Sequence, residues 1–173
     1  MYEKELKILD INADRVRSLL LEYGAVQTFA GMIDDMYYDS EDDHLRSRWY
    51  SCRIRQITPV EGEVSYMLCL KQKIKHKTCK VRHEREYKID NPLSYHYVLE
   101  SHGLEHIASK SKRRESYQIG KVVFDIDRYA DREPLLEIEW GKKAIRRRQE
   151  RLGLAMHETS KKWAWGLGLV ERR

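Results

Sequence analysis

Residues 2–8, Tyr-Glu-Lys-Glu-Leu-Lys-Ile, are the stretch from which the fold of this chain can be inferred. Successive side chains of an extended strand point to opposite faces, so Glu3, Glu5 and Lys7 share one face. The opposite face is mainly apolar. A single strand of this kind is typical of a sheet with one solvated face. The same pattern recurs along the chain, however, and this recurrence indicates a charged face shared by several strands.

Five further segments carry charged residues at alternate positions with apolar residues between them. They are residues 52–55, 65–73, 82–88, 123–127 and 135–139. Alternation with a period of two predicts strands. If the charged faces converge, a closed antiparallel barrel of about eight strands would enclose them and leave room for one small ligand. We therefore predict an α+β fold, mainly antiparallel β, in which helices flank an eight-stranded barrel.

Helices are predicted between the strands. Apolar residues at helical spacing indicate a helix over 13–23, with Asn12 or Asp10 as its N-cap. Asn91 precedes a second helix over 92–102, whose first residue is a proline. Both helices are interpreted as packing elements.

The C-terminal region is basic. Residues 142–152 predict a basic helix, and a short helix capped by Thr159 or Ser160 is expected to follow. We find no linker and no long repeat, so the chain is interpreted as a single domain over residues 1–173. This length is sufficient to bury one core.

Composition restricts the class of protein. The net charge of +5 and the pI near 9.0 favour an anionic partner. No apolar run is long enough to span a membrane, and the N-terminus lacks a signal-peptide pattern. Three cysteines without CxxC spacing indicate reduced thiols, so a cytoplasmic location is expected. Seven histidines without zinc-site spacing argue against a zinc enzyme.

The charges predicted to face inward include both signs. The bases are Lys7, Arg53, Arg55, Lys71, Lys112 and Arg114, and the acids are Glu3, Glu5, Glu84, Glu86, Asp127, Glu137 and Glu139. Unpaired charges at this density would be costly to bury, so they need partners, water, metal or ligand. Arginine and lysine bind phosphoryl oxygens, and clustered carboxylates bind Mg²⁺ or Mn²⁺. This combination indicates metal-assisted phosphoryl transfer.

The ordered motifs resemble those of the CYTH superfamily of triphosphate tunnel enzymes, named for class IV adenylyl cyclase and thiamine triphosphatase. The resemblance runs from residue 3 to residue 139. The matching segments are Glu3-Lys-Glu-Leu-Lys7 for ExExK, Asp35-Met-Tyr37-Tyr-Asp39 for DxYxD, Arg53-Ile-Arg55, Leu70-Lys71, Arg82-His-Glu84-Arg-Glu86, Lys112-Arg-Arg114-Glu-Ser-Tyr117, and Asp127 followed by Glu137-Ile-Glu139. The loop over 128–134 departs from the family pattern.

The resemblance implies an eight-stranded tunnel that binds a triphosphate, usually with Mg²⁺ or Mn²⁺. It assigns phosphate binding to Lys7, Arg53, Arg55, Lys71, Lys112 and Arg114, with Glu84 and Glu86 on the same substrate-binding wall. It assigns metal binding or water orientation to Glu3, Glu5, Asp127, Glu137 and Glu139. Glu3, Glu5 and Lys7 are the expected catalytic residues. Lys161 or Lys162 is expected to reach the tunnel from the C-terminal tail.

The leading hypothesis is a metal-dependent triphosphatase. Inorganic tripolyphosphate is the favoured substrate, because a simple tunnel needs no base pocket and no motif indicates one; nucleoside or thiamine triphosphate remains an alternative. A class IV adenylyl cyclase would use the same tunnel to make cyclic AMP. A non-catalytic binder of polyphosphate or RNA would use the basic segments 71–80 and 142–151, but we do not expect nucleic acid to be the partner. A homodimer is left open.

Overall fold

The computed structural model describes residues 2–74, 80–139, 159–160 and 171–172, and the side chains of residues 5–74 and 82–139. The strands are β1 (Tyr2–Ile8), β2 (Val26–Asp39), β3 (Tyr50–Pro59), β4 (Ser65–Ile74), β5 (Lys80–Ile89), β6 (Glu105–Ile119), β7 (Val122–Tyr129), β8 (Arg132–Glu139), β9 (Thr159–Ser160) and β10 (Glu171–Arg172). The helices are α1 (Ala13–Glu22), α2 (His44–Ser47) and α3 (Pro92–Ser101).

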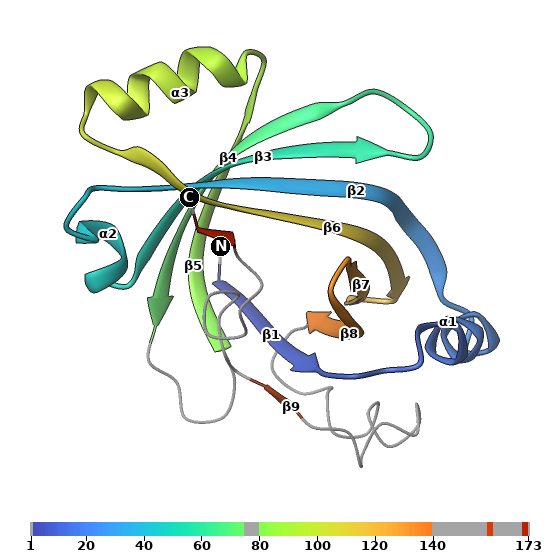
Figure 1. Cartoon of the computed structure of the whole chain (residues 1–173). Helices are drawn as coiled ribbons and strands as arrows, with labels where there is room; N and C mark the ends of the chain where they lie inside the picture. The colour runs from blue at the N-terminus through green and yellow to red at the C-terminus, as the bar shows by residue number, and fades with distance from the viewer. Residues whose placement is uncertain (1, 75–79, 140–158, 161–170, 173) are drawn as a thin grey trace.

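The strands form one antiparallel sheet that closes on itself. Its order is β6-β2-β3-β4-β5-β1-β8-β7, and β7 pairs back with β6. Every one of these pairs is antiparallel. In Figure 1 the strands curl around a common space, with α1 and α3 outside it. The prediction of a mainly antiparallel, eight-stranded barrel with flanking helices is therefore confirmed.

The short helix predicted to follow Thr159 or Ser160 lies outside the described residues. Thr159 and Ser160 form β9, which pairs with residues 7–8 of β1. Residues 2–5 of β1 pair with β5. This pairing does not extend to residues 7–8, so their edge is open to β9. The backbone groups of this edge take a strand as partner. The predicted basic helix over 142–152 lies outside the described residues.

The apolar residues pack outside the barrel wall. Beneath α1 they form a cluster of Ile8, Ile11, Ala13, Val16, Leu20, Ala25, Tyr117, Val122, Phe124, Ile126, Leu136 and Ile138. A second cluster on β2, β3 and β5 contains Tyr38, Cys52, Ile54 and Ile89, with Tyr95 and Leu99 of α3 packed against it. The predicted N-cap Asn12 is confirmed, since its side chain accepts from Arg15 N, and the side chain of Asn91 caps α3 by accepting from Leu93 N. No described helix is long and apolar enough to cross a membrane.

Candidate functional site

The inner face of the barrel carries buried charges. These residues, each at most 9 % exposed, are Glu5, Lys7, Asp35, Arg53, Lys71, Arg82, Lys110, Lys112, Arg114, Asp125, Asp127 and Glu137. They alternate with the apolar residues of the outer clusters, as the pleat of each strand requires. The inside of this barrel is therefore a polar site, while the hydrophobic cores lie between its wall and the helices.

A cluster with excess positive charge lies on β2, β3 and β6. The carboxylate of Asp35 accepts from Arg55 Nε at 2.7 Å and from Arg53 Nη1 at 3.2 Å. Lys110 Nζ lies 3.1 Å from the same carboxylate. Burial opposes ionisation, yet Arg53, Arg55 and Lys110 hold the pKa of Asp35 well below its usual range. Three cations around one carboxylate leave positive charge that suits an anionic ligand.

A second group of ion pairs lies on β6, β7 and β8. Asp127 contacts Lys112 Nζ at 2.5 Å and Arg114 Nε at 2.6 Å. Burial opposes ionisation, but Arg114 and Lys112 lower the pKa of Asp127. Arg114 also contacts Asp125 at 2.5 Å and Glu137 at 2.6 Å. The structure thus places Asp127, a predicted metal ligand, between two predicted phosphate ligands.

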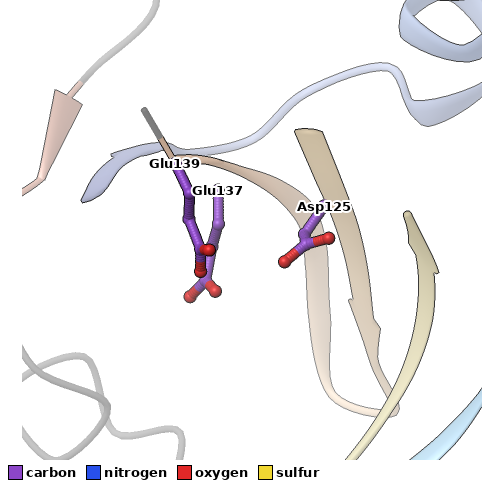
Figure 2. A group of neighbouring side chains, drawn as sticks. All are labelled: Asp125, Glu137 and Glu139. Atoms are coloured by element: carbon purple, nitrogen blue, oxygen red, sulfur yellow. The ribbon is translucent and has the colours of Figure 1, made fainter. Parts of the chain in front are cut away.

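Three carboxylates gather beside this group. One ligand atom from each of Asp125, Glu137 and Glu139 lies within 4.8 Å of the others. Figure 2 shows the three side chains turned toward a common space from β7 and β8. Asp125 Oδ1 is buried and has no hydrogen-bond partner among the described residues. Hard oxygen donors in this arrangement fit a divalent cation such as Mg²⁺ or Mn²⁺.

Residues of β1 join these acids to the opposite wall. Lys7 Nζ lies 2.8 Å from Glu5 and also forms an ion pair with Glu137. Arg82 Nη2 of β5 lies 3.3 Å from Glu5 Oε1. Burial opposes ionisation of Glu5, but Arg82 and Lys7 lower its pKa. The backbone of Glu3 pairs with that of Arg82, and its side chain lies outside the described part.

The wall formed by β4 and β5 contains the remaining predicted residues. Lys71 forms an ion pair with Glu84. The Cys69 thiol donates to Glu86 Oε1 at 3.3 Å. Cys69 and Lys71 are buried next to Arg53, because Cys69 pairs with Arg53 across β3 and β4, whereas Glu86 is exposed. Lys161 and Lys162 lie outside the described residues.

Several residues of the site were not assigned a role by sequence reasoning. They are Asp35, Arg82, Lys110, Asp125 and Tyr129. Period-two spacing could have found Lys110 and Asp125, which stand two residues before Lys112 and Asp127. Asp35 stood in the recognised DxYxD segment. Its contacts with Arg53, Arg55 and Lys110 required the sheet order, which brings β2 between β3 and β6.

A pocket of about 190 Å³ opens where the ends of β2, β3, β4 and β6 meet α2. We call it the aromatic pocket; its lining includes Tyr37, Trp49, Tyr50, Ser51, Lys73 and Ile107. Lys73 Nζ lies 5.0 Å from the centre of the Trp49 ring. Ser51 and Lys73 continue the inner-facing rows of Arg53 and Lys71, so the pocket continues the charged interior.

The described residues form a closed antiparallel barrel with a charged interior and helices on its outside. This is the architecture of a tunnel-like β domain. The sequence model of the CYTH domain matches residues 1–151. The chain therefore belongs to the CYTH domain family.

Solved structures agree with this fold. The PH1819 protein of Pyrococcus horikoshii superimposes with a TM-score of 0.81 at 21% identity, covering 96% of this chain and 98% of that one. A putative adenylate cyclase of Vibrio parahaemolyticus gives 0.75 at 20% identity, covering 97% and 98%. The putative adenylyl cyclase HpAC1 of Hippeastrum gives 0.67 at 16% identity, covering 95% and 94%. Among curated proteins, none matched this chain.

Proposed function

We propose that this protein is a metal-dependent triphosphatase whose substrate lies inside the barrel. The observation that carries the proposal is the placement of a cation-rich cluster and an acid-rich cluster in one buried interior. The cation-rich cluster surrounds Asp35 with Arg53, Arg55 and Lys110. The acid-rich cluster consists of Asp125, Glu137 and Glu139. Phosphoryl transfer needs both: cations for the phosphate oxygens and carboxylates for a metal.

Phosphate binding falls to the inner-facing bases. Arg53 and Arg55 present guanidinium groups that can exchange the carboxylate of Asp35 for phosphoryl oxygens. Lys71, Lys112 and Arg114 lie on the same inner face and extend this surface. Because their present partners are carboxylates, ligand binding replaces one anion by another. A bound triphosphate adds negative charge to this interior, and a divalent cation held by the acid-rich cluster would offset part of that charge.

Asp125, Glu137 and Glu139 would hold Mg²⁺ or Mn²⁺. The cation would neutralise phosphate charge and supply an activated water. Glu5 is kept ionised by Arg82 and Lys7, so its carboxylate could orient the attacking water by accepting a hydrogen bond from it. Lys7 contacts both Glu5 and Glu137, so it can orient the two carboxylates. Glu3 shares this face of β1 and is proposed to assist as a further acid.

The aromatic pocket bears on the choice of substrate. The sequence favours inorganic tripolyphosphate because no motif indicates a base pocket. The structure contains a pocket beside the charged interior, which supports a substrate with an organic group. Trp49 is a bulky residue held at a left-handed φ of 69°, with 38% of its surface exposed beside the pocket. An exposed aromatic face suits stacking of a planar ring. We therefore propose that the substrate is an organic triphosphate whose ring occupies this pocket.

The Hippeastrum neighbour is described as having a dominant triphosphatase activity. That description supports hydrolysis for this chain. The Vibrio neighbour is named a putative adenylate cyclase, and the same aromatic pocket could hold the base of ATP for cyclisation. The reaction products separate the two functions, because hydrolysis releases orthophosphate whereas cyclisation yields cyclic AMP and pyrophosphate.

The test measures products from tripolyphosphate, ATP and thiamine triphosphate with Mg²⁺, with Mn²⁺ and with chelator. We expect metal-dependent release of orthophosphate, lost in Glu137→Gln and in Asp125→Asn. Trp49→Ala should raise KM for the organic substrates while leaving tripolyphosphate unchanged. Formation of cyclic AMP and pyrophosphate would show that the reaction is cyclisation and not hydrolysis. Ligand binding without any product, retained in both acid variants, would support a non-catalytic polyphosphate binder.

A further inference from the structure

Tyr129 is a partly buried tyrosine of the barrel wall that no motif singled out, and its hydroxyl oxygen is buried. It is the last residue of β7 and stands two residues after Asp127, on the inner-facing row. The pairing of β7 with β8 shifts register between Asp127 and Tyr129, but the extra residue lies on β8, so Tyr129 keeps the alternation of β7. Its Oη is buried and has no hydrogen-bond partner among the described residues.

Charged groups of the interior surround Tyr129. Burial raises the pKa of Tyr129, and the charge of Asp127 raises it further, while Arg114 opposes the shift. Tyr37 and Asp35 on β2 act in the same direction as Asp127. A tyrosine phenol is neutral near physiological pH and can donate one hydrogen bond. It lies within electrostatic reach of both the cluster around Asp35 and the ion pairs of Asp127.

Other buried tyrosines of this chain have partners. Tyr117 Oη donates to Glu115 Oε2 at 3.0 Å on the outer side of the wall. Tyr38 Oη lies 3.1 Å from His96 Nδ1, beneath α3. Tyr37 Oη accepts from Arg53 at 3.4 Å. Because buried hydroxyls are normally hydrogen-bonded, the one at Tyr129 indicates an acceptor that arrives with a ligand.

The interior contains further buried polar atoms of this kind. Arg53 Nε and Asp125 Oδ1 also lack hydrogen-bond partners among the described residues. One is a donor in the cation-rich cluster and the other is an acceptor in the acid-rich cluster. Tyr129 contributes a neutral donor, and the charges of Asp35, Arg114 and Asp127 act on it. A triphosphate with its metal has the matching oxygens and positive charge.

We propose that Tyr129 is a further substrate-binding residue, whose hydroxyl donates a hydrogen bond to a non-bridging phosphoryl oxygen of the bound triphosphate. This inference rests on the proposed function, because it requires a triphosphate inside the barrel. Under this proposal, the hydroxyl of Tyr129 serves ligand binding and not the stability of the fold. Removing its hydroxyl breaks no hydrogen bond among the described residues, but it takes one donor from the complex.

The test compares Tyr129→Phe with Tyr117→Phe, which removes the hydroxyl bonded to Glu115. Thermal unfolding without ligand is measured first, and binding of inorganic tripolyphosphate is then measured by calorimetry with and without Mg²⁺. We expect Tyr129→Phe to keep the melting temperature of the wild type and to weaken binding by about tenfold or more. Tyr117→Phe should lower the melting temperature and leave binding unchanged.

Two results would overturn the inference while the proposed function stands. One is wild-type binding that Tyr129→Phe retains within a factor of two. The other is a loss of binding accompanied by a fall in melting temperature as large as that of Tyr117→Phe, which would make the role structural. If the wild type neither binds nor cleaves any triphosphate, the proposed function fails as well. That outcome is visible before the variants are compared.

Discussion

Arg114 and Glu115 are neighbours on β6 whose side chains lie on opposite faces of the barrel wall. Arg114 points inward and contacts Asp125, Asp127 and Glu137. Glu115 points outward and accepts from Arg17 of α1 at 2.7 Å, as well as from Arg128 and Tyr117. Both are networks of charged hydrogen bonds.

The two networks differ in what they leave unsatisfied. The inner one stands beside buried atoms that have no partner in the described part of the chain, such as Asp125 Oδ1. The outer one connects α1 to β6 and β7 through Arg17 and Arg128, and no atom of its charged groups is among those unpartnered atoms. We infer that the inner network exchanges its partners for a ligand, whereas the outer network stabilises the fold. The predictions below test this division.

The largest effect is expected for Arg53→Met. Asp35 would keep Arg55 and Lys110 as partners, so the protein should fold with nearly unchanged stability. Loss of one preorganised cation should lower the rate of triphosphate hydrolysis by roughly 100-fold. Steady-state kinetics at saturating metal measure the change. Arg17→Met is the matched control from the outer network and should retain the wild-type rate; equal losses in both variants would contradict the division.

Glu115→Gln should act in the opposite way. It removes the charge that Arg17 and Arg128 share, and both arginines are partly exposed. We therefore expect a loss of about 1 to 2 kcal/mol in the free energy of unfolding, measured with urea. Activity per folded molecule should not change. An active-site defect in this variant would show that the two faces of β6 are coupled.

The pH dependence of stability tests the role of Glu115 in the outer network. Hydrogen bonds from Arg17, Tyr117 and Arg128 lower the pKa of Glu115 to about 2, against the opposing effect of burial. A carboxylate whose pKa is lower in the folded state stabilises the protein above its unfolded pKa of about 4.3, and this contribution is lost as pH falls toward 2. The difference in unfolding free energy between wild type and Glu115→Gln should therefore be constant from pH 7 to 5 and shrink below pH 4.

The smallest effect is expected at a helix cap. Asn12→Ala removes the acceptor for Arg15 N at the start of α1 and should cost about 1 kcal/mol of stability. Hydrolysis should be unaffected, because α1 packs on the outside of the wall. Asn91→Ala at α3 is the parallel variant, since Asn91 accepts from Leu93 N. Urea titration and kinetics of both variants check the prediction; a kinetic defect in either would mean that its helix also positions the site.

The sequence predicted most inner-facing residues because strand alternation is a local property. Glu5, Lys7, Arg53, Lys112 and Arg114 were all expected on the charged face, and the structure buries them there. The alternation predicts the face of the strand on which a side chain lies, but it does not predict which side chains it contacts. It could not show that Asp127 contacts Lys112 and Arg114 while Asp125 gathers with Glu137 and Glu139, because the stagger between β6, β7 and β8 decides those contacts.

The aromatic pocket shows the same limit in another way. It is lined from four strands and the segment around α2, and no single stretch of the chain contains its pattern. Trp49 and Lys73 are 24 positions apart in the numbering, yet the backbone of Lys73 donates to Trp49 O at 2.8 Å. A surface assembled from separate segments has no sequence period to reveal it.

By itself, the sequence determined that this chain is a barrel with a charged interior and apolar outer faces, since period-two patterning and helix caps depend on neighbours in the chain. The tertiary structure alone decided how those charges are divided. It placed Asp35 among three cations, gathered Asp125 with Glu137 and Glu139, and left the hydroxyl of Tyr129 without a partner in the described part of the chain. The physical reason is that the closure and stagger of the barrel determine which strands face each other across its interior.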